Sequence, residues 1–220
     1  MSKQSDAYIP ALRYSWLTSI YDPVVRWTTR ESTFKSALLA QADIQPGEKI
    51  LDLGCGTATL TIAIKVACAE ADVVGLDGDP KILEIAAKKA ADVGVKISLD
   101  QGYSYELPYA DNTFHRVVSS LFFHHLTTAN KRRTLAEVER VLTPGGEFHL
   151  ADWGKAQNII MRGVFFIVQF LDGFETTTAN VQGRLPAMIE DAGFQDVRKT
   201  AEFATPLGTI SILSTKKSGL

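Results

Sequence analysis

The feature that most constrains the fold is a regular alternation of short apolar runs and longer helix-like segments from Lys49 onward. Each run is rich in Val, Ile or Leu, as expected of strands buried on both faces of a parallel sheet. The expected strands are Lys49–Leu53, Asp72–Leu76, Val95–Leu99, Arg116–Ser120 and Glu147–Ala151, and the expected helices are Ala58–Ala69, Pro80–Val93 and Ala129–Leu142. The pattern therefore predicts an α/β fold of the doubly wound class.

Local signals mark the ends of these elements. Asp79 is expected to cap the helix over Pro80–Val93, which has proline at its first position and Gly94 just beyond its end. Pro144-Gly145-Gly146 is expected to stop the helix over Ala129–Leu142. Near the C-terminus, Phe203–Ala204 and Thr209–Leu213 flank a turn that contains proline and glycine, which predicts an antiparallel hairpin at one edge of the sheet.

Length, charge and cysteine content narrow the function classes. A chain of 220 residues fits one domain with an appendage. The net charge of -2, without a basic cluster, argues against nucleic-acid binding. Two cysteines provide neither a disulfide framework nor a four-ligand zinc site, so no metal is expected. Met1–Pro10 lacks the regions of a signal peptide, so we expect a cytoplasmic protein, without a transmembrane segment but with membrane-surface contact possible.

The most informative motif runs from Ile50 to Thr59, where a buried strand enters a glycine-rich turn and then a helix. Gly54 and Gly56 allow a sharp turn and the close approach of a ligand. Thr59 replaces the third glycine of a dinucleotide fingerprint, so the motif gives little support for a pyrophosphate. Asp52 would repel a pyrophosphate, and it suits a ligand that carries a positive amino group.

A second acid ends the next strand. Asp77 lies 21 residues beyond Gly56, and a carboxylate at this place can accept hydrogen bonds from both hydroxyls of a ribose. Asp79 competes for this role, but it is better placed as the N-cap of the following helix. We therefore assign the ribose to Asp77.

These residues together resemble the class I S-adenosylmethionine-dependent methyltransferases. The resemblance rests on the Asp52–Thr57 loop, Asp77, the segment Gly102–Phe114 and the segment Arg140–Gly146. Within that family the chain is most similar to enzymes of ubiquinone and menaquinone biosynthesis and to phospholipid N-methyltransferases. The resemblance implies a Rossmann-like, seven-stranded, mostly parallel sheet with an antiparallel last strand, and S-adenosyl-L-methionine as the cofactor.

The resemblance also implies a cofactor site, expected at Asp52, Gly54, Cys55, Gly56, Thr57, Asp77, Gly78, Gln101, Gly102, Tyr103, Ser104, Leu121 and Phe122. Members of the family usually carry an acid at the position of Tyr103, where it contacts the adenine amino group. Two alternatives to that acid are open in this sequence. In the first, Tyr103 stacks on the adenine or forms a hydrogen bond with it. In the second, the side chain of Gln101 or Ser104 binds the adenine amino group.

Candidate catalytic residues follow the fourth strand. His124 and His125 either cap the strand end or face the methyl acceptor, where an imidazole could remove a proton or hold the acceptor in place. Tyr21 is a further candidate near the cofactor carboxylate, by analogy with related enzymes. Methyl transfer needs no protein nucleophile, so a Ser119-His124-Asp152 triad is not expected.

The expected division of the chain is an N-terminal helical cover (1–45), a cofactor-binding core (46–152), a lid with the last helix (153–195) and a closing hairpin (196–220). The lid contains Ile159–Leu171, which is apolar nearly all round and too short to span a bilayer. This segment packs as a lid, lines an apolar acceptor pocket or contacts a membrane surface. Phe165, Phe166, Phe170 and Trp153 are the candidate acceptor contacts.

The sequence therefore predicts methyl transfer, by in-line displacement, to a small hydrophobic or amphipathic acceptor such as a quinone precursor or a lipid headgroup. Two alternatives remain open at this point. A NAD-linked oxidoreductase would share the parallel sheet, the glycine loop and the acid after the second strand. A noncatalytic cofactor-binding or partner-binding protein would keep the same motifs without turnover.

Overall fold

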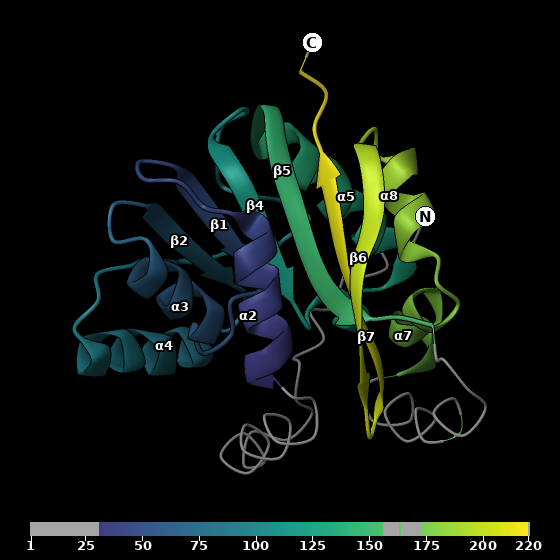
Figure 1. Cartoon of the computed structure of the whole chain (residues 1–220), viewed down its shortest axis with the longest axis horizontal. Helices are drawn as coiled ribbons and strands as arrows, with labels where there is room; N and C mark the ends of the chain where they lie inside the picture. The colour runs from purple at the N-terminus through teal and green to yellow at the C-terminus, as the bar shows by residue number, and fades with distance from the viewer. Residues whose placement is uncertain (1–30, 156–162, 164–172, 220) are drawn as a thin grey trace, which may run out of the picture.

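The computed structural model describes residues 31–155, 163 and 173–219, in which seven strands form one sheet (Figure 1). The strands are β1 (Lys49–Leu53), β2 (Asp72–Asp77), β3 (Ser98–Gln101), β4 (Phe114–Ser120), β5 (Leu142–Trp153), β6 (Gln195–Thr205) and β7 (Gly208–Lys216). Their order is β3-β2-β1-β4-β5-β7-β6. The pairs among β1 to β5 are parallel, and β7 runs antiparallel to both of its neighbours. The expected fold class, with its reversed last strand, is confirmed.

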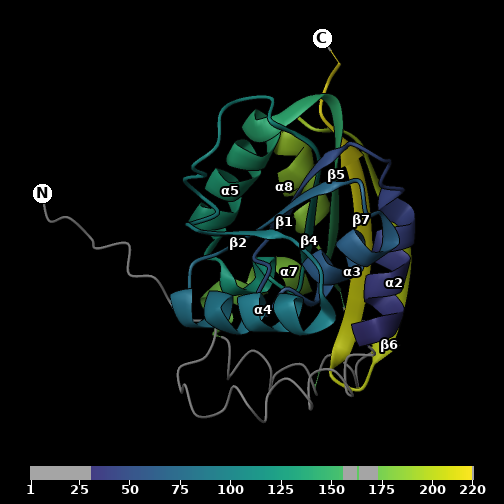
Figure 2. The same ribbon diagram turned by 90° about the vertical axis from the view of Figure 1, so that its left-hand side faces the viewer.

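Helices cover both faces of this sheet. They are α2 (Glu31–Ala42), α3 (Thr59–Ala67), α4 (Pro80–Val93), α5 (Thr128–Val141), α7 (Phe174–Val181) and α8 (Leu185–Asp191), with a short 3-10 helix η2 (Phe123–His125) after β4. Figure 2 shows the sheet nearly edge-on, with α2 and α3 on one side and α5 and α8 on the other. This arrangement explains why the central strands are apolar on both faces.

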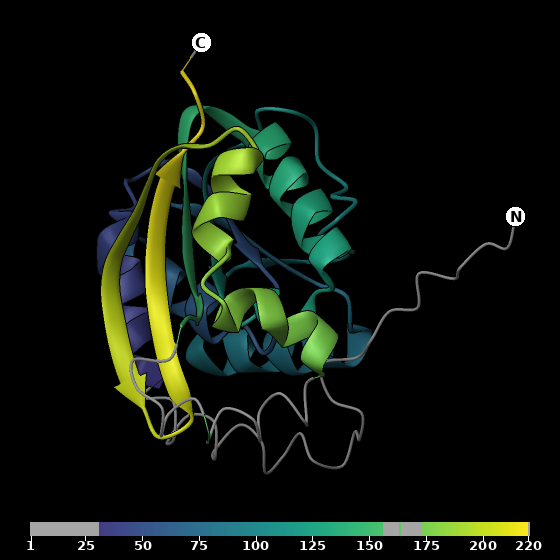
Figure 3. The same cartoon turned by 90° about the vertical axis from the view of Figure 1, so that its right-hand side faces the viewer.

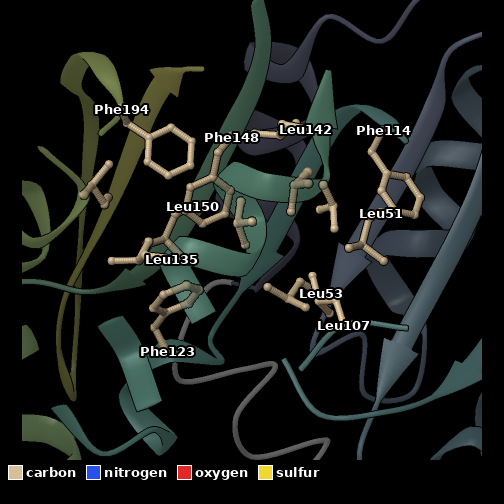
Figure 4. Packing of buried hydrophobic residues seen from close by; sticks show 14 of the residues in the cluster. Leu51, Leu53, Leu107, Phe114, Phe123, Leu135, Leu142, Phe148, Leu150 and Phe194 are labelled. Atoms are coloured by element: carbon tan, nitrogen blue, oxygen red, sulfur yellow. The ribbon is translucent and has the colours of Figure 1, made fainter. Parts of the chain in front are cut away.

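Alternate residues of β1 supply the two halves of the core. Leu51 and Leu53 face α5, where they belong to one buried cluster with Leu135 and Phe148 (Figure 4). Ile50 points to the opposite face and belongs to a second cluster with the α2 side chains. Full burial of one such leucine contributes about 1.5–3 kcal/mol. The two clusters fix the register of the central strands and so place their carboxyl ends along one edge.

Helix α4 begins and ends as expected. The Asp79 side chain accepts a hydrogen bond of 2.9 Å from the Lys81 amide, and Pro80 is the first helical residue. Gly94 closes the helix with φ 73°, and its amide bonds to the carbonyls of Ala90 and Ala91. The capping prediction is therefore confirmed.

Two strand predictions were wrong by three residues or more at one end, whereas β2 ends one residue later and β4 begins two residues earlier than expected. Strand β3 covers Ser98–Gln101 rather than Val95–Leu99, because Val95 and Ile97 pack against the cluster between α3 and α4 before pairing with β2 begins. Strand β5 begins at Leu142 and contains the Pro144-Gly145-Gly146 segment, with a shift in its pairing to β4. A Cβ atom at Gly146 would lie 2.9 Å from the Thr143 carbonyl oxygen, so glycine permits this close passage.

The C-terminal hairpin is confirmed and is longer than expected. Strands β6 and β7 pair from Thr205 opposite Gly208 to Gln195 opposite Lys216. The calls on Tyr21, Phe165, Phe166 and Phe170 lie outside the described residues, as does most of the Ile159–Leu171 segment. Among the residues that the structure describes, no helix is long and apolar enough to cross a bilayer.

Candidate active site

The carboxyl ends of β1, β2, β3 and β4 meet around one cavity of about 100 Å³. Polar groups and aromatic rings from four separate strand ends share its wall. The lining residues are Gly54, Leu76, Asp77, Gly78, Gly102, Tyr103, Ser104, Tyr105, Phe122, His125, Leu126, Thr127 and Asn130. A cavity at the carboxyl edge of a parallel sheet is the usual place for a ligand in this class of fold.

The glycine loop after β1 is held against β2 by its own backbone. The amides of Gly54 and Cys55 both donate to the Leu76 carbonyl, at 2.9 and 3.0 Å. Gly54 and Gly56 have φ values of 70° and 54°, in the left-handed region. A Cβ atom at Gly54 would lie 2.2 Å from Cγ of Phe122, whereas one at Gly56 would meet nothing within 4 Å. The Phe122 side chain therefore packs directly on the loop, and only glycine fits beneath it.

Asp77 presents a fixed carboxylate to the cavity. Its Oδ2 accepts from the Gly56 amide at 2.9 Å, and its Oδ1 accepts from the Asp79 amide at 3.0 Å. Burial raises the pKa of Asp77, and these backbone hydrogen bonds oppose the shift. Each carboxylate oxygen has two lone pairs, so both can accept a further hydrogen bond from a ligand.

Asp52 lies beneath the loop and is absent from the cavity wall. Asp52 is 1% exposed, and its Oδ2 accepts a hydrogen bond of 2.6 Å from the Thr61 hydroxyl. Burial raises the pKa of Asp52 to about 6, although the bond from Thr61 lowers it. The carboxylate is therefore buried beneath the loop rather than exposed to the cavity.

Aromatic rings form the β3 side of the cavity. Tyr103 and Tyr105 stack with their centroids 5.4 Å apart and their planes 2° from parallel, and the Arg133 guanidinium lies 4.6 Å from the Tyr105 ring centroid. Ser104 is buried, with its hydroxyl 2.8 Å from that of Thr134. Gln101 lines an adjoining hollow beside Tyr103. Of the alternatives for reading an adenine, Tyr103 and Ser104 line the cavity, and Gln101 lines the adjoining hollow.

The two histidines occupy different environments. His125 lines the cavity, and burial lowers its pKa well below the ordinary value, with His124 and Lys131 adding to the shift. His124 is buried behind it, with the two ring centroids 3.9 Å apart. Nδ1 of His124 lies 2.9 Å from Oδ1 of Asp152. His125 is therefore the histidine that faces the cavity, and His124 supports it.

Asp152 connects this wall to the rest of the fold. Its Oδ2 accepts from the amides of Phe122 and His124, at 3.1 and 3.3 Å. Its Oδ1 accepts from the Trp153 amide at 2.7 Å and from Nδ2 of Asn180 at 3.1 Å. One buried carboxylate at the end of β5 thus holds the segment after β4 and helix α7 in a fixed relation.

Comparisons with known proteins address the function of this arrangement. Residues 50–146 match a family of methyltransferase domains. An uncharacterized methyltransferase of Synechocystis sp. is 34% identical over 193 residues, which cover 85% of this chain and 86% of that protein. The chain belongs to this methyltransferase family. It is an S-adenosylmethionine-dependent enzyme, so the oxidoreductase and noncatalytic alternatives are set aside.

Other relatives of the methyltransferase act in quinone biosynthesis, according to their names. A demethylmenaquinone methyltransferase of Symbiobacterium thermophilum is 36% identical over 133 residues, which span 59% of this chain and about half (52%) of that protein. A ubiquinone/menaquinone biosynthesis C-methyltransferase of Shewanella pealeana is 29% identical over 76% of this chain and 74% of its own. The crystal structure of the YcgJ protein of Bacillus subtilis shares the fold, with a TM-score of 0.69 at 16% identity over 84% of this chain and 97% of that one.

The residues present fit the chemistry of the methyltransferase cofactor. Asp77 offers a fixed acceptor for ribose hydroxyls, Asp52 places negative charge beneath the loop, and the tyrosine rings offer a stacking surface. The described part of the cavity is smaller than the roughly 300–1,000 Å³ of typical ligand sites.

The structure brings together many, but not all, of the residues that the sequence singles out. Gly54, Asp77, Gly78, Gly102, Tyr103, Ser104, Phe122 and His125 share the cavity wall, whereas Asp52, Cys55, Gly56, Thr57, Gln101, Leu121 and His124 lie beneath or beside it. Burial raises the pKa of the Cys55 thiol, which keeps it protonated. Trp153 is buried in a cluster with the α2 side chains, and it also lines a second cavity that contains Asp152 and Asn180.

Several residues of the site escaped the sequence analysis. Tyr105, Leu126, Thr127 and Asn130 line the cavity, and Lys131 is fully buried behind it. The Lys131 ammonium donates to the carbonyls of Leu126 and Thr176, both at 2.5 Å, and burial lowers its pKa to about 8. Asp152 carried a usable signal, because it is an acid at the carboxyl end of a strand, as Asp52 and Asp77 are.

Proposed function

We propose that this methyltransferase methylates a small hydrophobic or amphipathic acceptor, of which a reduced quinone precursor is the first candidate. Two kinds of support lead to this proposal. Relatives named for demethylmenaquinone and for ubiquinone/menaquinone biosynthesis match the chain. The cavity wall carries the apolar side chains of Leu76, Phe122 and Leu126 beside its polar groups.

Within this proposal, Asp77 holds the ribose, the loop of Gly54 and Gly56 contacts the methionine part, and Tyr103 stacks on the adenine. The carrying observation is the Asp77 carboxylate, which two backbone amides fix at the cavity wall. The bound cofactor supplies an electrophilic methyl group. The chain then has to align the acceptor with that group and to exclude water.

His125 is the proposed proton acceptor for the reacting group of the methyl acceptor. Its imidazole lines the cavity, and burial lowers its pKa, so the ring is neutral near pH 7 and one ring nitrogen can accept a hydrogen bond from the reacting group. His124 acts as a positioning residue, because its ring packs on His125 and is held by Asp152. Tyr21 remains a prediction near the cofactor carboxylate, and Phe165, Phe166, Phe170 and Trp153 remain predictions for the acceptor side.

The cofactor assignment is tested with two neighbouring acids. We expect Asp77→Ala to weaken the binding of S-adenosylhomocysteine at least tenfold, because hydrogen bonds to a charged acceptor contribute about 1.5–3 kcal/mol each. Asp79→Ala is the matched control, since it removes a helix cap from the same loop and should leave the dissociation constant nearly unchanged. Isothermal titration calorimetry measures both. Equal affinities for Asp77→Ala and the wild type would refute the ribose assignment.

The acceptor is tested by methyl transfer from isotopically labelled cofactor. The substrates are chemically reduced demethylmenaquinone, phosphatidylethanolamine vesicles and a mixture of polar amino acids, and products are identified by mass. We expect label in the reduced quinone. Label in the phospholipid alone would replace the quinone with a lipid headgroup, and label only in the polar compounds would overturn the proposal.

A further inference from the structure

A second cavity, of about 230 Å³, has Asp152 in its wall. It is bounded by the start of α8, by the segment between α7 and α8, and by one face of β5, β7 and β6. Figure 3 shows α7 and α8 in green beside the yellow strands β6 and β7. Leucines from three elements, Leu150, Leu185 and Leu213, form apolar walls, and Asp152 and Asn180 contribute the buried polar groups.

Asn180 has an unusual hydrogen-bonding state in this cavity. The residue is 1% exposed, and its Nδ2 donates to Asp152, which fixes the amide plane. Its Oδ1 is buried and has no hydrogen-bond partner among the described residues. A buried carbonyl oxygen without a partner is destabilising, and such groups in folded proteins call for an explanation. A ligand that donates a hydrogen bond to Oδ1 would supply one.

We propose that Asn180 determines acceptor specificity by accepting, through Oδ1, a hydrogen bond from a hydroxyl group of the methyl acceptor. This inference rests on the proposed function and narrows its acceptor class to amphipathic alcohols or phenols. The leucine walls receive the apolar part of the molecule, and Asn180 receives its hydroxyl.

The position of Asp152 joins this cavity to the chemistry. Its carboxylate lines the second cavity and also accepts from the amides of Phe122 and His124, beside the cofactor cavity. Asn180 is therefore fixed by the same group that fixes the wall carrying His125. A hydroxyl bound at Asn180 is held in a constant relation to that wall, as alignment for methyl transfer requires.

The charged groups around the cavity balance one another. Lys155 is exposed, Lys199 pairs with Glu202 at 2.7 Å, and Asp152 contributes a buried carboxylate. Two basic and two acidic side chains therefore leave no net charge on the lining, and the hydrogen-bonding groups decide which ligand it takes.

The test compares two probes that differ in one hydrogen-bond donor. 1-Naphthol can donate to Asn180, and 1-methoxynaphthalene cannot. We expect the wild-type enzyme, saturated with S-adenosylhomocysteine, to bind 1-naphthol about tenfold more tightly by isothermal titration calorimetry. Asn180→Leu, which has a similar shape and no acceptor, should bind both probes with the same dissociation constant.

Thr209→Val is the matched control. The Thr209 hydroxyl is the other buried side-chain oxygen without a partner in the described part of the chain, and it does not line the cavity. This variant should keep the tenfold preference. Equal binding of the two probes by the wild type would overturn the inference, and this comparison needs no variant. A preference for 1-naphthol that survives in Asn180→Leu would overturn it as well. Neither result depends on methyl transfer, so failure here is separate from failure of the proposed function.

Discussion

The contact between Gly54 and Phe122 allows a quantitative test of how the loop is built. Gly54→Ala would place a Cβ atom 2.2 Å from Cγ and 2.8 Å from Cβ of Phe122. These atoms lie at the root of the side chain, so a change of ring orientation alone does not relieve the clash. The Phe122 amide is itself held by Asp152, and the preceding residue, Leu121, has a φ of 51°. The backbone beneath the ring is therefore poorly able to move.

The expected loss follows from a comparison with Gly56→Ala. Backbone strain of an alanine in the left-handed region destabilises the fold by about 1–2 kcal/mol. The smaller conformational entropy of the unfolded chain offsets about 0.4–1 kcal/mol of this loss. Both variants share these terms, because Gly56 also has a positive φ. Overpacking adds about 1–3 kcal/mol at Gly54 alone. For a chain of this size 1 kcal/mol corresponds to about 2–4 °C, so Gly54→Ala should melt about 2–12 °C below Gly56→Ala.

Thermal unfolding followed by circular dichroism measures this difference. The same substitution in a Phe122→Ala background isolates the clash, since the added Cβ then has room. We expect Gly54→Ala to cost less in that background than in the wild type. An equal melting temperature for Gly54→Ala and Gly56→Ala, or an equal cost in both backgrounds, would refute the packing argument.

Two further predictions concern buried charge and loop anchoring. Burial raises the pKa of Asp52 to about 6, so the folded protein favours the protonated carboxyl group. The stability that this group contributes is fully present below about pH 4 and is lost as the pH rises through 6. Relative to the wild type, the free energy of unfolding of Asp52→Asn should therefore rise by about 3 kcal/mol between pH 4 and pH 7. Denaturant unfolding at the two pH values measures this change, and a difference that does not depend on pH would contradict the prediction. Arg140 donates to the carbonyls of Leu107 and Tyr109 and bonds to Glu137. Arg140→Lys loses the guanidinium group that makes these bonds, and it should destabilise the fold by about 1–3 kcal/mol in urea unfolding. The exposed control Arg132→Lys should stay within about 0.5 kcal/mol of the wild type. Equal effects of the two substitutions would count against the anchoring role of Arg140.

Elements with strong local signals could be predicted from the sequence. The limits of β1 and α4 agree with the structure, because the first is a dense apolar run and the second carries its own cap, proline and terminal glycine. The start of β5 could not be predicted. A proline and two glycines normally stop an element, yet Leu142 already pairs with Phe114 of β4, and the pairing resumes at Glu147 after a register shift. The Gly146 carbonyl accepts a hydrogen bond of 2.9 Å from the Lys217 amide, just beyond β7.

The candidate site divides in the same way. Asp77 and the glycine loop are visible in sequence because each follows a recognisable strand. The roles of Asp152 and Asn180 depend on contacts between segments 28 residues apart, which no local pattern encodes. The sequence also gave no reason to prefer His125 over His124, since only the turn of η2 decides which ring faces the cavity.

The outer edge strand β6 also bears on the behaviour of this protein in a crowded solution. An exposed edge offers unpaired amide and carbonyl groups on which the strand of another molecule can add. Here two register irregularities interrupt β6, Asp196 has a φ of 56°, and Arg198, Lys199 and Glu202 place charge along the strand. The opposite edge, β3, is four residues long. Both borders of the sheet thus discourage edge-to-edge aggregation, and substitutions that straighten or neutralise β6 should raise it.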